Sequence, residues 1–549
     1  MARLFNRGAR NLSDSSYPEI SQSNDTKVPN DVEAYNDESA SIEVNSYDST
    51  GVKRGLKDRH ISLIALAGII GPGILVGAGI TLRTGGPLAL LIAVILIGIV
   101  AFSIMVSLGE IISIYPSGNG FATLARRFHS NSLGAVSGYN YVIVWFCVLS
   151  NEYNTLSSIM RYWDVDEKIP LYGYILIFWV FFECFQLLGV SAFGEAEYWL
   201  ALIKIFGLIA YYIFSIIYIS GGIKGRPAFG FHYWNDPGAL THGFRGVASV
   251  FTYVSTFFSG VEGISSTVSE TKNPSRAIPR AIRQTVFRII FIYLFIAIFY
   301  GATVPSNDPN LLASERALKS PIGIAIVNAG WNGGTHLVNA FILITCLSAV
   351  NSSIYIGSRT LTHLSSEGLA PRIIAWKNKR GVPVVAVTLM NLLGLLSIMN
   401  MSTGAANAFT YIVNISGVAV FIVWGIISYT HIRVRSAWKK QGFDLSQLPY
   451  RTRLFPWIAW FGLAANVFLG LVQGWTTLSP FVAGDFVDAY ILLPFAVVIY
   501  VVTGLVKGFS VVDLHTIDLD EGRRLDLDEA TVTDPDDKIP WFKRFWKEF

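Results

Sequence analysis

The feature that most constrains this chain is a series of apolar stretches, each close to the length that crosses a membrane. They recur from residue 61 to residue 506 and are separated by short polar segments. About 20 consecutive apolar residues form a helix long enough to span the hydrocarbon core of a bilayer. Only 15% of the residues are charged, whereas a soluble domain has roughly 25%. These observations predict an all-α integral membrane protein.

The apolar stretches predict about twelve transmembrane helices. They lie near residues 61–82, 87–109, 135–160, 171–190, 197–220, 247–268, 285–304, 336–356, 384–400, 407–430, 456–478 and 487–506. Lysine and arginine gather before the first span and in the loops after the second, sixth, eighth and tenth. Positively charged loops usually stay in the cytosol, so both termini are expected to be cytosolic. The turn after the fourth span is an exception, because it carries Glu195 and Glu197 and neither lysine nor arginine.

The segments on either side of the spans are expected to be cytosolic tails. Residues 1–55 are rich in Ser, Asn, Asp and Glu, and such a segment cannot bury enough apolar surface to fold. We predict that this tail is disordered, that residues 56–506 form the transmembrane domain, and that residues 507–549 form a C-terminal tail. The N-terminal tail is either a regulatory segment, modified at its serines or at Lys27 and bound by trafficking and ubiquitin machinery, or a solvated segment without such a role.

The first span contains two residue types that interrupt helices. Residues 68–79 are GIIGPGILVGAG. Close packing of a neighbouring helix would explain Gly73 and Gly77, but it would not explain Pro72, which removes a backbone donor and clashes with the preceding turn. We expect the helix to unwind around Gly71, Pro72 and Gly73, leaving free N–H groups that can bind a carboxylate.

The sixth span repeats this interruption with TFFSGVEGISS at residues 256–266. Interrupted helices at corresponding positions of two halves are typical of transporters built from inverted repeats, with the substrate between the breaks. Inverted repeats are therefore expected over about residues 61–220 and 247–430, followed by two accessory helices. Ser259, Gly260 and Glu262 lie where unwound carbonyls and a carboxylate can hold an ammonium group.

Three ionisable residues inside the spans are candidates for function, because a charge in the membrane is costly and is usually functional. Glu262 either binds substrate or pairs with a cationic neighbour. Glu152, in the outer half of the third span, faces either a water-filled vestibule or the membrane interface. Lys204, in the fifth span, either snorkels to the cytosolic end or is a buried amine whose protonation couples to transport. Phe257 and Phe258, beside the sixth-span break, are either core residues or a gate over the substrate.

Other polar positions have simpler interpretations. Four residues share one face of the eighth span, where hydrogen bonds between helices are expected: Ser348, Asn351, Ser352 and Tyr355. Glu110, which precedes the turn sequence YPSGNG, is interpreted as part of a loop signal.

The chain lacks the patterns of an ATP-driven pump or an enzyme. It has no Walker A loop and no zinc-ligand spacing, its eight histidines are scattered, and no basic helix suited to nucleic acid occurs. We therefore expect no catalytic residue, no metal, no cofactor and no nucleic-acid partner. The energy for transport would come from an ion gradient or from exchange.

Several motifs resemble the fungal amino-acid permeases of the amino acid/polyamine/organocation superfamily. The similarity covers residues 55 to about 506 and includes GIIGPGILVGAG, GEIISIYPSGNGF, SAVNSSIYIGSRTLTHLSSEGLAP followed by RGVP, and HIRVRSAWKKQG. The resemblance implies a LeuT-type fold, with two inverted repeats of five helices plus two accessory helices. It also implies proton-coupled uptake of amino acids at the plasma membrane.

The resemblance also implies roles for individual residues. The carboxylate-binding break of the family falls here on Gly71, Pro72 and Gly73, and its amine-binding break falls on Ser259, Gly260 and Glu262. The third-span acid of the family resembles Glu152, and its proton-coupling lysine resembles Lys204. Three positions depart from the family, in which a small residue, a threonine and a leucine are usual: Pro72, Val261 and Gly263.

The expected function is therefore secondary transport. The protein would import amino acids with protons across the plasma membrane, surrounded by membrane lipid, by alternating access around the two breaks. Two alternatives stay open: a non-transporting amino-acid sensor of the same fold, and a permease for polyamines or other organic cations. A sensor is expected to need a larger cytosolic domain than these tails offer, and a cargo without a carboxylate would not use the N–H groups of residues 71–73.

Overall fold

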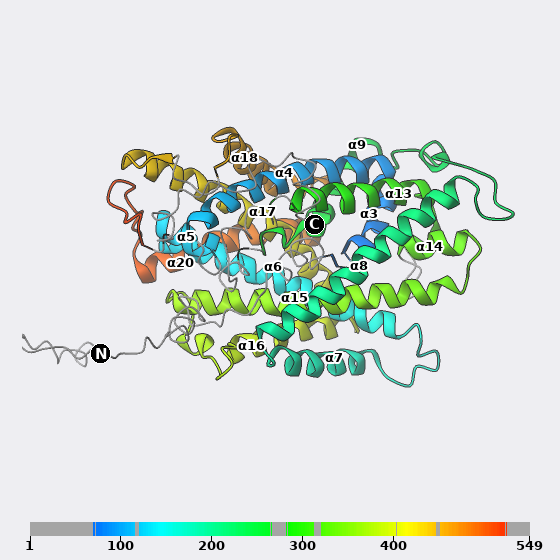
Figure 1. Ribbon diagram of the computed structural model, residues 1–549, viewed down its shortest axis with the longest axis horizontal. Coiled ribbons are helices and arrows are strands. Elements are labelled where there is room, and N and C mark those ends of the chain that lie inside the picture. Colours follow the sequence, from blue (N-terminus) through cyan, green and yellow to red (C-terminus); the bar gives the residue numbers. More distant parts are fainter. Residues whose placement is uncertain are drawn as a thin grey trace, which may run out of the picture. The chain divides into compact units, whose positions relative to one another are not determined.

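A computed structural model describes residues 70–523 of the chain, apart from residues 72, 116–119, 264, 266–281, 283, 312–319, 402, 446–450 and 522. The predicted N-terminal tail with Lys27, the breaker Pro72 and residues 524–549 lie outside the described residues. The described part is helical, and its extended pairing is limited to an isolated bridge between Leu478 and Phe481 (Figure 1). The prediction of an all-α protein is confirmed.

Eight helices of the described part are long and apolar enough to cross a membrane. Four of them are single helices: α4 (Pro87–Ile114), α6 (Asn131–Met160), α8 (Val190–Ile219) and α15 (Gly334–Ser366). The other four are Gln284–Thr303 with η5 (Ile289–Leu294) and α13 (Phe295–Thr303), Val384–Met401 with α16 (Val384–Gly394) and η8 (Leu395–Met401), Ile415–Lys440 within α17 (Thr403–Lys440), and Trp457–Thr477, which begins with α18 (Trp457–Val472). A ninth results if α19 (Ala483–Tyr490) and α20 (Leu492–Lys507), which meet at an angle of 44°, form one span. The chain is thus a multi-pass membrane protein.

The number of twelve spans stays a prediction. The first predicted span is described only from Ile70 onward, the fourth corresponds to the shorter apolar helix α7 (Leu171–Gln186), and the sixth divides into short helices. The remaining short helices are η2 (Gly73–Gly77), α3 (Ala78–Gly85), α5 (Gly120–Phe128), η3 (His232–Trp234), α9 (Gly243–Ser249), α10 (Phe251–Phe258), η4 (Val261–Gly263), η6 (Pro309–Leu311), α14 (Pro321–Asn328), η7 (Arg372–Ala375) and η10 (Trp475–Thr477).

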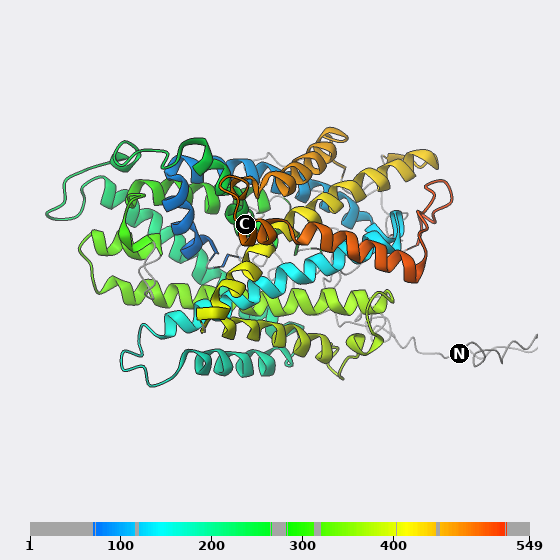
Figure 2. The ribbon, with the colours of Figure 1, turned by 180° about the vertical axis from the view of Figure 1, so that it is seen from behind.

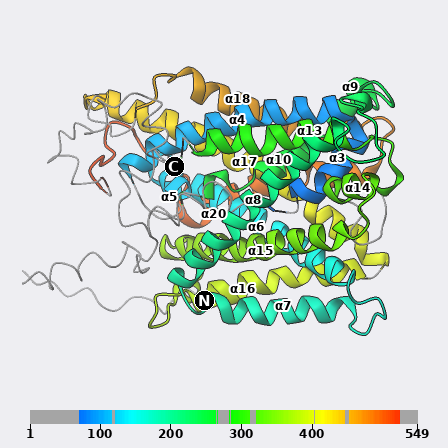
Figure 3. The same ribbon diagram turned by 45° about the vertical axis from the view of Figure 1, so that its right-hand side comes forward.

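Helix α6 occupies the middle of the bundle. It packs against α15 on one side and against α17 on another. Helices α15, α16 and α7 lie together below α6, whereas α4, α13 and α18 lie together above it (Figures 1 and 3). Seen from behind, α17 in yellow and α20 in orange run beside α6 in cyan (Figure 2). Side chains of α6 therefore have protein neighbours on several sides.

Several helices are longer than their apolar stretches. Helix α8 begins at Val190, so Glu195 and Glu197 belong to its first turns, and the prediction that they lie in a loop is wrong. Helix α17 continues to Lys440, so Arg433 and Arg435 are helical and not part of a loop. Polar residues extend these helices because they bond to protein neighbours and do not face lipid.

Glu110 is one such residue. It lies inside α4 and is 1% exposed, so its interpretation as part of a loop signal is wrong. Its Oε2 accepts hydrogen bonds of 2.9 Å from Nη2 of Arg435 and from the backbone N–H of Thr452, and its Oε1 lies 3.1 Å from Nε2 of His431. Glu110 thereby joins the end of α4 to α17.

The chain after α20 is also bound to the bundle. We name residues 511–521 and 523 the C-terminal strap. Its backbone forms hydrogen bonds of 2.8–2.9 Å with residues near the ends of α4, α5 and α17: Val512 N–H with His129 O, Val512 O with Arg433 Nη2, Ile517 O with Gln441 Nε2, and Leu519 O with the Tyr115 hydroxyl. Leu519 is 2% exposed. The start of the predicted C-terminal tail is therefore packed against the helices.

Candidate functional site

The described part of the first span begins as two residues without regular structure, Ile70 and Gly71, and becomes helical at Gly73. The π-helix η2 then passes directly into α3. The N-terminal end of this continuous helical segment therefore lies at Gly73. Nothing is described for Pro72, so its predicted part in the break stays a prediction.

The sixth span changes direction where the glycines of its sequence lie. Helix α10 ends at Phe258, Ser259 and Gly260 form a turn, and the 3-10 helix η4 follows. Gly260 has a φ of +93°, a backbone conformation that side-chain-bearing residues rarely adopt. The backbone conformation of Gly260 therefore ends the helix. The last carbonyl groups of α10 have no N–H partner within the helix.

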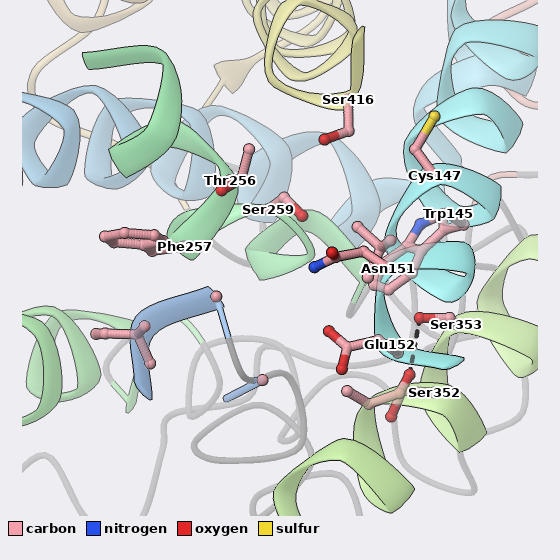
Figure 4. A pocket seen from close by; sticks show the side chains of 15 residues that line it. Trp145, Cys147, Asn151, Glu152, Thr256, Phe257, Ser259, Ser352, Ser353 and Ser416 are labelled. Carbon is pink, nitrogen blue, oxygen red and sulfur yellow. Dashed lines mark hydrogen bonds between the residues drawn. The ribbon is translucent and has the colours of Figure 1, made fainter. Parts of the chain in front are cut away.

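A pocket lies between these two segments (Figure 4). It is lined by residues from the start of the first span, α6, the end of α10, α15 and α17, among them Gly71, Gly73, Asn151, Glu152, Thr256, Phe257, Ser259, Ser352, Ser353 and Ser416. In the close view the carboxylate of Glu152 and the amide of Asn151 point into the space between the elements. Among the described residues that line the pocket, Glu152 is the only one with an acidic or basic side chain.

Glu152 and Gly71 approach each other closely. A Cβ atom added to Gly71 would lie 3.2 Å from Oε1 of Glu152 and 3.5 Å from Cβ of Ala349. Glu152 is 3% exposed, and its Oε2 has no hydrogen-bond partner within the part of the chain that the structure describes. A buried carboxylate oxygen without a donor is costly, so this atom is suited to a ligand that donates.

The two phenylalanines of the sixth span have different places. Phe257 lines the pocket, and its ring lies 3.5 Å from the position of a Cβ on Gly73. Phe258 is fully buried outside the pocket lining and stacks on Tyr293, with ring centroids 4.1 Å apart. The geometry thus makes Phe257 the candidate gate, although Phe258 was predicted as a site residue from the sequence.

Glu262 points into the protein and not into the pocket. Its Oε1 accepts a hydrogen bond of 3.0 Å from the backbone N–H of Gly260, and its Oε2 accepts one of 2.9 Å from Nε1 of Trp424. Of the three residues predicted to bind the amine, Ser259 lines the pocket, whereas Gly260 and Glu262 shape the turn that presents Ser259.

Lys204 does not line the pocket, and it does not snorkel to the end of the helix. It is fully buried, and its Nζ donates a hydrogen bond of 2.7 Å to Oγ of Ser348. Ser348 in turn donates to Oε2 of Glu197 at 2.6 Å, and Nδ2 of Asn351 donates to Oε1 of Glu197 at 2.7 Å. The expected bonds from the polar face of the eighth span are confirmed for Ser348 and Asn351, which join α15 to α8.

Glu197 is the functional candidate that the sequence analysis missed. It was interpreted as a turn residue because its position precedes the apolar run. A signal was present: Glu197 and Lys204 are seven residues apart, or two helical turns, so they share one face if the helix extends that far. Asn151 was also missed, although it is the sequence neighbour of Glu152.

The chain is similar to known amino acid permeases. Residues 60–515 match the protein family described as amino acid permease. The chain is 61% identical over 500 residues to the general amino acid permease AGP3 of Saccharomyces cerevisiae, covering 90% of this chain and 89% of that protein. It is 47% identical to an uncharacterized amino-acid permease of Schizosaccharomyces pombe, covering 93% and 95% of the two chains. It is 33% identical to the lysine-specific permease of Saccharomyces cerevisiae, covering 91% and 83%.

Proposed function

Because the chain belongs to the amino acid permease family, we propose that it is a secondary transporter that imports amino acids with protons across the plasma membrane. The observation that carries this proposal is the pocket between the start of η2 and the end of α10. A helix carries partial positive charge at its N-terminus and partial negative charge at its C-terminus. The pocket therefore offers opposite charges on its two sides, as a zwitterion requires.

The substrate carboxylate would bind at Gly71 and Gly73, near the N-terminal end of the η2–α3 segment. The substrate ammonium group would bind between Ser259, at the end of α10, and Glu152, whose Oε2 has no donor among the described residues. This assignment moves the amine-binding role from Glu262 to Glu152. Pro72 is proposed to keep the first break open, since its backbone cannot donate a hydrogen bond.

Lys204 would carry the coupled proton. A fully buried amine pays a large desolvation cost when charged, so its protonation responds strongly to nearby charges. Lys204 interacts electrostatically with Glu152, which the proposal places at the substrate amine. Proton binding at Lys204 and substrate binding in the pocket would thereby affect each other.

The transport cycle would follow from the repeat architecture. We propose that the two five-helix repeats, over about residues 61–220 and 247–430, rock against each other around the pocket and expose it alternately to the two sides of the membrane. The cytosolic position of both termini, and binding of trafficking and ubiquitin machinery to the tails, are part of the same proposal.

Uptake of labelled amino acids tests this function. Cells that lack their own permeases would express the protein and receive each of the twenty amino acids, with and without a proton gradient. We expect gradient-dependent accumulation, and we expect Glu152→Gln to lower it. Glu183→Gln is the matched control, because Glu183 is a carboxylate of α7 that bonds to Thr388 and Asn391 away from the pocket. Protein that reaches the surface and moves no amino acid would refute the proposal.

A second candidate cargo is an organic cation such as a polyamine. It is favoured by the pocket lining, in which Glu152 is the one charged side chain among the described residues. A cation without a carboxylate would not need the helix end at Gly73. If putrescine competes with amino acids for uptake in the parent protein, and Gly73→Ala affects only the amino acids, the protein carries both classes.

A further inference from the structure

Five buried charged groups belong to the pocket and its surroundings. Three are carboxylates, Glu152, Glu197 and Glu262, and none is more than 3% exposed. Two are cations, Lys204 and Arg288, and both are fully buried. The described side chains around the pocket therefore include three acidic and two basic groups, and a charge buried in a low-dielectric site is costly unless it is paired.

One carboxylate and one cation belong to the support of the sixth-span turn. Glu262 interacts electrostatically with Arg288. Arg288 donates a hydrogen bond of 2.7 Å from Nη2 to the hydroxyl of Tyr293, which itself donates to the carbonyl of Phe257 at 2.7 Å. This pair supports the backbone between Phe257 and Glu262, and the other two described carboxylates interact with Lys204.

Lys204 interacts with two of the carboxylates. It reaches Glu197 through Ser348, with bonds of 2.7 Å and 2.6 Å, and interacts electrostatically with both Glu197 and Glu152. Among the described residues, Arg288, which repels Lys204, and the thiol of Cys346 also interact with it electrostatically. Of the two carboxylates, only Glu152 lines the pocket, so only Glu152 is within reach of a substrate.

We propose that Glu197 is a positioning residue that holds the charged Lys204 side chain, so that Glu152 stays available for the ammonium group of the substrate. This inference rests on the proposed function. With Glu197 present, two cations, the Lys204 ammonium and the substrate ammonium, have two carboxylates. Without it, both cations compete for Glu152, because like charges near one carboxylate repel each other.

The pH dependence of substrate affinity tests whether the Glu197 carboxylate keeps Lys204 from competing with the substrate for Glu152. Labelled L-alanine is the first probe, since it has both backbone groups and a small side chain; if the parent does not move it, the fastest amino acid of the uptake panel replaces it. In the parent, the concentration for half-maximal uptake is not expected to rise as the pH falls from neutral to mildly acidic. In Glu197→Gln it is expected to rise by about tenfold, the effect of losing one charge-assisted contact.

A second substitution distinguishes an electrostatic role of Glu197 from a purely structural role. Lys204→Met removes the competing cation, so the double variant Glu197→Gln/Lys204→Met is expected to bind alanine with parent-like, pH-independent affinity and to exchange it without accumulating it. Glu183→Gln, a change of a carboxylate outside this cluster, is expected to keep the pH profile of the parent. Glu197→Asp, which retains the carboxylate, is expected to show most of the pH profile of the parent.

Each outcome supports or contradicts the proposed role of Glu197. If Glu197→Gln keeps the pH profile of the parent, the inference is wrong although the proposed function stands. If Glu197→Gln fails to reach the surface and the double variant succeeds, the need for Glu197 is electrostatic, as inferred. If both fail, Glu197 serves the hydrogen-bond network of Ser348 and Asn351, and the inference is wrong. A parent that moves no amino acid overturns the proposed function itself.

Discussion

At the scale of single residues, the contact between Gly71 and Glu152 has a direct consequence. A methyl group on Gly71 would lie 3.2 Å from Oε1 of Glu152, closer than an ordinary contact, whereas a methyl group on Gly77 would lie 3.6 Å from Phe257. We expect Gly71→Ala to displace the carboxylate and to weaken substrate binding by about tenfold, the effect of one lost charge-assisted bond. Gly77→Ala should be near the parent. Half-saturation of uptake at equal surface expression measures both, and equal values for the two variants would contradict the role of Glu152.

Alanine substitutions of the neighbours Phe257 and Phe258 are expected to have different effects. Phe258 is fully buried and stacks on Tyr293, so Phe258→Ala should lower the free energy of unfolding by about 3–5 kcal/mol. Phe257 lines the pocket, so Phe257→Ala should lower the free energy of unfolding by less than Phe258→Ala does. It should also alter which amino acids compete for uptake. Thermal unfolding in detergent and a competition panel measure the two effects. A loss of selectivity in Phe258→Ala alone would reverse this assignment.

Some site residues could be predicted from the sequence because their chemistry is unusual for a membrane span. Glu152 and Lys204 are charges inside apolar runs, and Gly71 and Gly73 flank a proline, so each is conspicuous without a structure. The partners of these residues are less visible. Nothing in the sequence tells that Glu262 bonds to Trp424, which is far along the chain, or that Phe257 and not Phe258 faces the pocket.

At the scale of elements, the ends of helices were the main source of error. Hydropathy places a helix end where charge begins, so Glu197 was assigned to a turn and Glu110 to a loop signal. Both are buried inside helices because each has donors from another helix: Ser348 and Asn351 for Glu197, and Arg435 for Glu110. A charge with a buried partner costs far less than hydropathy assumes, and that partner lies in another part of the chain.

The bond between α4 and α17 is expected to matter for stability. Glu110 is 1% and Arg435 is 5% exposed, so Glu110→Ala would leave a buried guanidinium without its carboxylate. We expect a loss of about 3–5 kcal/mol in the free energy of unfolding. The double variant Glu110→Ala/Arg435→Ala should lose less than the sum of the two single variants. Thermal unfolding of all three proteins measures this coupling, and strictly additive losses would show that the two residues act independently.

At the scale of the whole molecule, the C-terminal strap joins parts that are far apart in sequence. Residues of the strap bond to Tyr115, His129, Arg433 and Gln441 at the ends of α4, α5 and α17. A chain that stops after Lys507 should therefore unfold more easily, by an amount on the order of several kcal/mol for the lost bonds and buried leucines. A chain that stops after Arg523 is the control, because it keeps the strap, and it should unfold less easily than the chain that stops after Lys507. Equal unfolding temperatures for all three lengths would show that the strap does not support the bundle.

The architecture as a whole was more predictable than its details. Repeated apolar runs predict a helical membrane protein, since few other structures satisfy every backbone group in lipid. The place where the sixth span turns could also be predicted, because Gly260 supplies a backbone conformation that other residues rarely adopt. The strap could not, since residues 511–523 are polar enough to be taken for a free tail, and their hydrogen bonds depend on helix ends that only the folded bundle brings together.

The narrow space between Gly71 and Glu152 also limits how such a protein can change its cargo over time. A side chain at position 71 would occupy the space beside Oε1 of Glu152, so substitutions at positions 71 and 152 act on the same part of the pocket. Their effects on substrate affinity are therefore expected to be non-additive. Libraries that change one position at a time would not sample the paired substitutions in which the two effects combine.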